Sequence, residues 1–222
     1  MIHTKAIEYI LFDLDNTLYS AGYGLEKAVN RRINQYISGY LGLPPEAAWA
    51  LRRERIASRG YGTTLEWLMA EKGFEPCMVD EYYDLIHPEN EADTLPPDHE
   101  LGSFLVSLGL PMAIMTNSPK EHALRVIKKL GMQELFPSIF DIRFNGLKGK
   151  PHAEAFTRVL DAIGKSPERC LFVDDSRPYV EGYRALGGPG VFFDEFDEHP
   201  EFPGPRINSL KSLIGLRELS FS

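Results

Sequence analysis

A short apolar run over residues 6–12 ends in two carboxylates, Asp13 and Asp15, and this segment constrains the fold more than any other. β-Branched and aromatic residues dominate the run, which predicts a buried strand. Side chains two apart in a strand point to the same side, so both carboxylates should emerge at its carboxyl end, where ligands bind in open α/β sheets. Adjacent carboxylates repel unless a cation joins them. The pair therefore indicates a site, with an ordinary Asx-type turn as the alternative.

Length, charge and cysteine content limit the kinds of protein that this chain can be. A chain of 222 residues predicts one large domain, or one domain with a small insertion. The formal net charge of -8 argues against a nucleic-acid binder, which needs a basic face, but leaves room for one bound phosphate. We find no apolar run long enough to span a membrane, and residues 1–5 lack the features of a signal peptide. Cys77 and Cys170 lie in unlike contexts, which predicts no disulfide framework and a cytoplasmic location.

Residues 20–92 are predicted to form a separate helical unit. Apolar residues recur there at helical spacing, and Gly and Pro residues divide the pattern into four predicted helices, which cover about 25–41, 43–60, 63–73 and 76–87. A block of helices directly after one strand indicates a small bundle inserted into another domain. We therefore expect a helical cap at 20–92 and an α/β core made of 1–19 and 93–222.

The remainder of the chain alternates between strands and helices. Strands are predicted at about 110–115, 139–144, 169–173 and 190–193, and helices at 96–109, 119–130, 152–163, 178–186 and 207–219. An acidic loop is expected between Asp194 and Pro205. This alternation predicts an α/β fold with a parallel sheet that helices cover on both faces.

Two further segments place anion-binding groups at the ends of predicted strands. Thr116 and Asn117 lie between a buried strand and a helix N-terminus, where a hydroxyl, an amide and backbone N–H groups can converge on a phosphate. Ser118 has the spacing to Glu121 of a capping box and is predicted to cap that helix. Lys150 precedes a helix opened by proline; a loop lysine is usually just solvated, but here it can complete the same anion site.

Asp174 and Asp175 end another apolar strand and repeat the pattern of the first. Two such pairs on one parallel sheet would gather four carboxylates at its carboxyl edge. Repulsion among four carboxylates would destabilise the fold unless a divalent cation binds between them. Mg2+ is the natural ion there, because it binds carboxylate oxygens together with phosphate oxygens. Two unrelated acidic turns are the alternative.

In order, the four segments are Asp13-x-Asp15-x-Thr17, Thr116-Asn117, Lys150-Pro151 and Asp174-Asp175. Together they resemble the four motifs of the haloacid dehalogenase (HAD) superfamily, over nearly the whole chain. The resemblance implies a Rossmann-like core with a helical cap inserted after the first motif. It also implies a small phosphorylated substrate and Mg2+ as the cofactor.

Matched position by position, the resemblance implies a role for each motif residue. Asp13 is the nucleophile and a metal ligand, while Asp15 is the general acid and base and offers its backbone carbonyl to Mg2+. Thr116 and Lys150 hold the phosphoryl oxygens, and Asp174-Asp175 holds the metal. A carboxylate can attack phosphorus to give an aspartyl-phosphate, and Asp15 can protonate the leaving group and then activate water. Dehalogenases of the superfamily lack an Asp two residues after the nucleophile, so the resemblance favours phosphoryl transfer.

Within the superfamily, several stretches resemble the pyrimidine 5'-nucleotidase-like group. They are Asp13 to Tyr19, Tyr61-Gly62-Thr63-Thr64-Leu65, Thr116-Asn117 with His122-Ala123, and Lys150-Pro151. The resemblance implies hydrolysis of a nucleoside monophosphate such as UMP or CMP. The chain departs from the group at Trp67, where a glycine is usual, and a bulky indole there is expected to reshape the pocket.

The residues that would contact the substrate are Tyr19, Tyr61, Gly62, Thr63, Thr64 and His122. Each also has a structural alternative: a turn with a helix cap for the 61–64 loop, core packing for Tyr19, and local packing for His122. Three other functions use the same motifs. They are a phosphatase for a sugar phosphate or pyridoxal phosphate, a phosphomutase, and a catalytically silent binding or regulatory protein.

Overall fold

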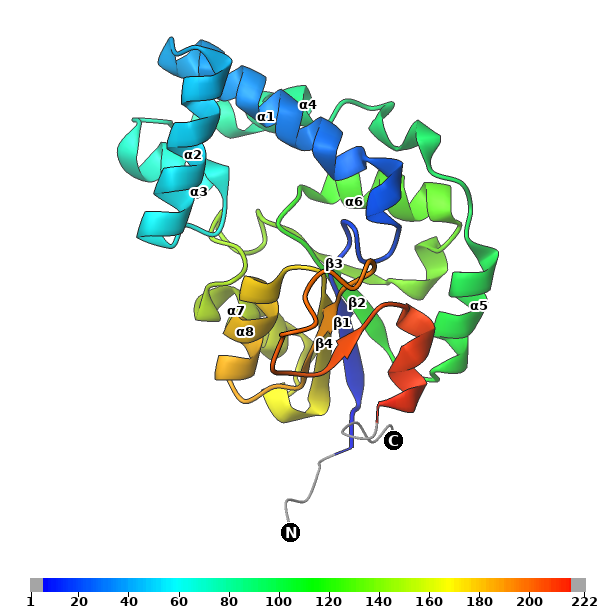
Figure 1. Cartoon of the computed structure of the whole chain (residues 1–222). Helices are drawn as coiled ribbons and strands as arrows, with labels where there is room; N and C mark the ends of the chain where they lie inside the picture. Colours follow the sequence, from blue (N-terminus) through cyan, green and yellow to red (C-terminus); the bar gives the residue numbers. More distant parts are fainter. Residues whose placement is uncertain (1–5, 217–222) are drawn as a thin grey trace.

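The computed structural model describes residues 6–216, which form a six-stranded sheet with helices on both faces and a helical cap (Figure 1). All neighbouring strands pair in parallel, in the order β3-β2-β1-β4-β5-β6. The strands are β1 (Tyr9–Phe12), β2 (Met112–Met115), β3 (Ser138–Phe140), β4 (Cys170–Asp174), β5 (Gly190–Phe193) and β6 (Arg206–Ile207). The predicted α/β fold with a parallel sheet is confirmed. The predictions for residues 1–5 and for a helix reaching Leu219 extend outside the described residues.

Helices pack on each face of the sheet because consecutive strand residues point to opposite sides. In β1, Ile10 and Phe12 join the apolar cluster shared with α5, α6 and η6, whereas Leu11 joins the cluster shared with α7 and α8. The core helices are α5 (His99–Ser107), α6 (Lys120–Leu130), α7 (Ala153–Ile163) and α8 (Arg177–Ala185). Short 3-10 segments are η3 (Glu91–Thr94), η4 (Gln133–Leu135), η5 (Pro167–Arg169) and η6 (Leu210–Gly215).

Two predicted elements differ from the structure. The strand predicted to reach residue 144 ends at Phe140, because Asp141 begins a turn and accepts hydrogen bonds from the N–H groups of Lys120 and Phe144. In place of a closing helix from residue 207, the chain forms the short edge strand β6 and then η6. β6 is held at the sheet edge partly by Arg206, which pairs with Asp194 at 2.7 Å.

The cap contains four α-helices above the carboxyl end of the sheet (Figure 1). They are α1 (Leu25–Leu41), α2 (Pro45–Arg59), α3 (Thr64–Glu71) and α4 (Val79–Ile86), with 3-10 turns at η1 (Ala21–Tyr23) and η2 (Pro76–Met78). Their apolar faces form a second hydrophobic cluster, built around Trp67 and Tyr82, which Ile142 of the α/β core joins. No helix in the described range is long and apolar enough to span a bilayer.

Trp67 does not reshape the pocket, contrary to the expectation from sequence. Its side chain is fully buried in the cap core, and its Nε1 donates to Glu71 Oε2 at 3.2 Å. On α3 its position places the indole among the neighbouring cap helices, so it supports the cap rather than a ligand.

Candidate active site

A cavity of about 420 Å³ lies between the cap and the carboxyl ends of β1, β2 and β4, and we call it the cap–core cavity. Its core wall includes most of the predicted site residues: Asp13, Asp15, Thr116, Asn117, Lys150 and Asp175. Its cap wall includes Arg52, Gly62, Thr63, Thr64 and His87. The sheet explains this convergence, because adjacent parallel strands end at one edge and deliver their following residues to the same place.

Lys150 joins the first and last motifs through two ion pairs. Its Nζ lies 2.5 Å from Asp13 Oδ1 and 2.6 Å from Asp174 Oδ2. The lysine and Asp174 are almost wholly buried, while Asp13 keeps a small exposed area facing the cap–core cavity. Thr17 Oγ1 donates to the other oxygen of Asp13 at 3.3 Å. A buried ammonium between two carboxylates fixes their positions, and only Asp13 of the two lines the cavity.

Asp13, Asp174 and Asp175 form the donor set for a metal ion. One oxygen from each lies within 4.8 Å of the other two. Burial, together with repulsion from neighbouring carboxylates, raises the pKa of Asp13 to about 8 and that of Asp175 to about 9. The single ammonium of Lys150 is thus too little positive charge for the cluster. Three hard oxygen donors with unbalanced negative charge fit Mg2+.

Mg2+ should stabilise the protein more strongly as the pH rises. The raised carboxyl pKa values mean that the metal-free folded state binds protons more tightly than the unfolded chain. The free energy of unfolding without metal therefore falls as the pH rises towards about 9. Deprotonated carboxylates bind Mg2+, so the increase in Tm on adding Mg2+ should be larger near about pH 9 than near about pH 6.

Thermal unfolding with and without Mg2+ at the two pH values checks this expectation. Asp175→Asn should abolish most of the Tm increase, whereas Asp84→Asn, which removes an exposed carboxylate of the cap, should preserve it. An equal increase at both pH values, or in Asp175→Asn, would contradict the assigned metal site.

The carboxylate of Asp15 points away from this donor set and is held by three side chains. Its Oδ1 accepts from Tyr19 Oη at 2.6 Å and contacts His122 Nε2 at 2.7 Å, and its Oδ2 accepts from Ser118 Oγ at 2.9 Å. Burial opposes ionisation of Asp15, but His122 and Tyr19 outweigh it and lower the pKa of this carboxyl below its usual range. Asp15 is therefore a positioned carboxylate with one edge on the cap–core cavity.

Tyr19 and His122 fit the structural alternatives given for them, whereas Ser118 differs from its predicted role. Tyr19 is buried and does not line the cap–core cavity, so it positions Asp15 and does not contact a substrate there. Ser118 does not cap α6, because Pro119 occupies the N-cap position and the serine hydroxyl turns to Asp15. His122 is fully buried and also lies outside the cavity wall.

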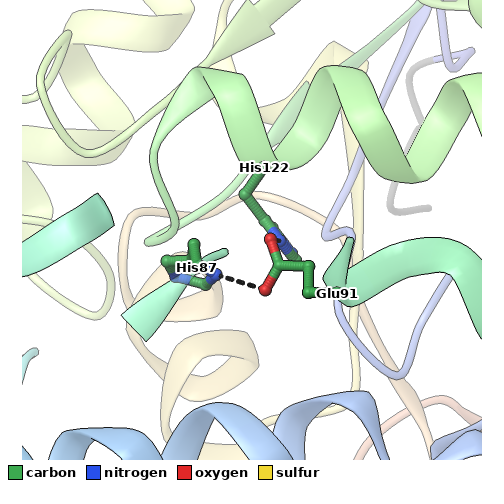
Figure 2. Close-up of side chains that lie close together, drawn as sticks. All are labelled: His87, Glu91 and His122. Carbon is green, nitrogen blue, oxygen red and sulfur yellow. Dashed lines mark hydrogen bonds and ion pairs between the residues drawn. The ribbon is translucent and has the colours of Figure 1, made fainter. Parts of the chain in front are cut away.

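Behind Asp15, His122 continues into a buried network with Glu91 and His87, shown in Figure 2. His122 Nδ1 lies 2.6 Å from Glu91 Oε1, and His87 Nδ1 lies 3.0 Å from Glu91 Oε2. Each ring nitrogen of His122 faces a carboxylate, which requires both to donate and hence an imidazolium. Burial alone would lower the pKa of His122, but Asp15 and Glu91 raise it to about 10.

This histidine cluster has ligand atoms close enough for a metal, but its charge is already balanced. Arg125 lies 2.9 Å and Arg32 lies 3.3 Å from the carboxylate of Glu91. Burial opposes ionisation of Glu91, but His122 and His87 lower the pKa of this carboxyl below its usual range. A divalent ion would therefore meet two guanidinium groups. The sequence did not indicate Glu91 or His87, because single residues in a helix end and a 3-10 turn carry no motif.

Asn117 lines the cap–core cavity, and its side-chain amide bonds the backbone of Lys150. Its Nδ2 donates to the carbonyl oxygen of Lys150 at 2.9 Å, and its Oδ1 accepts from the Lys150 N–H at 2.8 Å. Gly149 permits this approach, since a Cβ there would lie 2.0 Å from Asn117 Oδ1. Asn117 thus fixes the lysine's backbone, and the contact of this side chain with phosphate stays a prediction. Thr116 lines the cavity, as its predicted phosphate contact requires.

The 61–64 loop of the cap reaches the cap–core cavity, but not with all its side chains. A Cβ at Gly62 would lie 2.4 Å from the carbonyl oxygen of Lys150, so only glycine allows the cap this close. Thr63 caps α3 by accepting from Glu66 N–H, and Thr64 also lines the cavity. Tyr61 does not line the cavity, and its hydroxyl donates to Glu71, so this geometry gives no support to its predicted substrate contact.

Comparison with known proteins identifies the family. The model of the haloacid dehalogenase-like hydrolases matches residues 7–187, and the chain belongs to that family. Among curated relatives, phosphoglycolate phosphatase of Escherichia coli is 27% identical, over 95% of this chain and 93% of the relative. Glyceraldehyde 3-phosphate phosphatase of Methanocaldococcus jannaschii is also 27% identical, over 95% and 96%.

Solved structures agree on the fold. A HAD hydrolase of Bacillus subtilis bound to magnesium aligns with a TM-score of 0.62 at 19% identity, covering 95% of this chain and 98% of that one. A HAD phosphatase of Thermococcus onnurineus gives a TM-score of 0.62 at 21% identity, covering 94% and 97%. L-2-haloacid dehalogenase of Xanthobacter autotrophicus gives 0.61 at 15% identity, covering 95% and 98%. Hydrolases of different chemistry thus share this α/β core and cap.

Proposed function

We propose that the chain is a Mg2+-dependent phosphomonoester hydrolase that works through an aspartyl-phosphate on Asp13. The observation that carries the proposal is the contact of Asp13 with Lys150 at 2.5 Å, in a three-carboxylate cluster that opens on the cap–core cavity. The two curated relatives named above are phosphatases, which supports this choice within the family. Asp15, two residues after the nucleophile, supports phosphoryl transfer over dehalogenation.

The residues at the strand ends would supply the nucleophile, the phosphate-binding groups and the metal ligands of this reaction. The carboxylate of Asp13 would attack phosphorus while Lys150 and Thr116 hold the phosphoryl oxygens. Asp13, Asp174 and Asp175 would hold Mg2+, with Asp15 contributing its backbone carbonyl. When bound, this ion neutralises phosphoryl charge and orients the phosphate.

Asp15 would first protonate the leaving group and then deprotonate the water that hydrolyses the aspartyl-phosphate. A general acid needs a proton, and the imidazolium of His122, whose Nε2 lies 2.7 Å from Asp15 Oδ1, could supply it. The proton rests on His122, and as the alkoxide departs Asp15 would accept this proton from His122 and deliver it to the leaving oxygen. As a carboxylate, Asp15 can then accept a proton from the water that attacks the aspartyl-phosphate.

For the substrate, we propose a small phosphorylated metabolite rather than a pyrimidine nucleotide. The relatives named for phosphoglycolate and glyceraldehyde 3-phosphate support this choice. Three residues that the nucleotidase resemblance assigned to substrate contact, namely Tyr19, Tyr61 and His122, do not line the cap–core cavity. Their placement therefore weakens the case for a nucleotide. A pyrimidine 5'-nucleotidase remains the second candidate, since Gly62, Thr63 and Thr64 do line it.

Phosphate release from a panel of esters tests the function and ranks the substrates. The panel contains phosphoglycolate, glyceraldehyde 3-phosphate, pyridoxal phosphate, UMP, CMP and p-nitrophenyl phosphate, each with Mg2+ or with a chelator. We expect release only with Mg2+, with the highest kcat/KM for a small ester. A preference for UMP or CMP would favour the nucleotidase. Absence of release from every ester would favour a silent homologue.

A further inference from the structure

The cap wall of the cap–core cavity contains a cation that the proposed chemistry does not use. Arg52 of α2 lines this cavity, as does Lys150 on the core side. Lys150 is neutralised by direct contact with two carboxylates. Among residues 6–216, in contrast, no carboxylate oxygen lies within 4 Å of the Arg52 guanidinium.

Neutral oxygens hold this guanidinium in place. Its Nε donates to Thr64 Oγ1 at 2.7 Å, its Nη2 to Asn30 Oδ1 at 2.8 Å, and its Nη1 to Asn34 Oδ1 at 3.3 Å. Glu26, which also lines the cap–core cavity, attracts Arg52 electrostatically from beyond ion-pair distance, and its Oε1 accepts from the amide of Asn30 at 3.3 Å. Arg52 is thus positioned from three sides without a direct counter-ion.

The remaining donors of Arg52 suit a bidentate anion. A guanidinium has five N–H groups, and three of them are used by these contacts, which leaves one on each terminal nitrogen. Two such N–H groups on a planar fork match the two oxygens of a carboxylate. Burial, which lowers the pKa of Arg52, also makes its charge costly unless an anion joins it.

We propose that Arg52 binds a carboxylate carried by the leaving group of the substrate. The preferred substrates would be phosphomonoesters with a carboxylate close to the ester oxygen, held with the phosphate at Lys150 and the carboxylate at the cap. This inference rests on the proposed function and adds a substrate class and a cap residue that selects it. It also gives α2 a role in specificity, because Arg52 enters the cavity from that helix.

A matched pair of substrates tests the proposal. 2-Phosphoglycolate carries the carboxylate, and 2-phosphoglycolamide replaces it by a neutral amide of nearly the same size. Arg52→Gln should lower kcat/KM for the acid by about 10- to 100-fold, mostly through KM, because a charge-assisted hydrogen-bond pair is lost. The loss for the amide should be only about 3-fold or less. The change in the acid-to-amide ratio is the readout, since a purely structural defect would lower both rates together.

Two further variants complete the design. Arg52→Lys keeps the charge but loses the fork, so its loss of selectivity should be intermediate, and it carries the test if Arg52→Gln fails to fold. Arg53→Gln removes the same charge from the same helix at an exposed arginine that stacks on Trp49 and does not line the cap–core cavity. That control should preserve both rates and their ratio.

The outcomes separate this inference from the proposed function. Equal losses on both substrates, or an unchanged ratio in both Arg52 variants, would overturn the carboxylate contact. Turnover of p-nitrophenyl phosphate without any wild-type preference for the acid over the amide would also overturn it, while the phosphatase assignment stands. Absence of turnover on p-nitrophenyl phosphate and on both glycolate esters would overturn the proposed function, and this inference with it.

Discussion

Asp13→Asn is expected to abolish phosphate release, lowering kcat by about 10,000-fold or more, because the amide cannot attack phosphorus. The fold should persist, since Asn has nearly the same size and Lys150 keeps its ion pair with Asp174 at 2.6 Å. Steady-state phosphate release gives the rate, and thermal unfolding reports the fold. In the wild type, acid quenching during turnover followed by mass spectrometry should find a phosphoryl group on the peptide that contains Asp13.

Asp194→Asn is the matched control for this variant. Asp194 is also a buried carboxylate with a cationic partner, Arg206, but it does not line the cap–core cavity. Its replacement should affect stability and leave kcat near that of the wild type. Substantial turnover by Asp13→Asn, or a phosphoryl group on another residue, would refute Asp13 as the nucleophile.

Asp15→Asn is expected to slow the two steps that move a proton. For an alkyl phosphate such as phosphoglycolate, kcat should fall by about 100- to 10,000-fold, because the leaving alkoxide is no longer protonated. p-Nitrophenolate leaves without protonation, so the first step should survive with that ester while hydrolysis of the aspartyl-phosphate becomes slow. Rapid mixing should therefore show a burst of p-nitrophenolate close to one per active site, followed by a slow steady rate.

The burst distinguishes a lost acid and base from a damaged site. A general disturbance around Asp15 would remove the burst as well as the steady rate. An unchanged rate with the alkyl phosphate would exclude Asp15 as the general acid. Tyr19→Phe is a useful companion variant, because it removes one hydrogen bond to Asp15 Oδ1 and keeps the carboxylate. Its effect on kcat should be much smaller, about 10-fold or less.

The sequence determined the sheet and the chemistry at its carboxyl edge. Buried strands have strong local signals, namely short apolar runs bounded by polar residues, and parallel strands deliver the residues after them to one edge. For this reason, the sequence alone predicts that Asp13, Asp174 and Asp175 lie close together. The helical cap was predictable too, because four amphipathic segments after one strand cannot join a sheet. The exact domain boundaries and the catalytic roles stay predictions.

Local pattern could not decide which way each side chain faces within the site. From sequence, a ligand contact and packing inside the protein were both open for His122 and for Tyr19, and only the tertiary structure showed that both turn to Asp15. Trp67 was expected at the pocket, but its place on α3 directs it into the cap core.

Contacts between distant segments were the second matter left to the tertiary structure. Glu91 lies 31 residues before His122, and Arg52 lies about 100 residues before the lysine that shares its cavity. Such contacts depend on how the cap docks on the sheet, and no short motif encodes that docking. The reacting groups could thus be predicted from sequence alone, because they follow directly after the predicted strands. The folded cap decided which residues support those groups and which of them face the substrate.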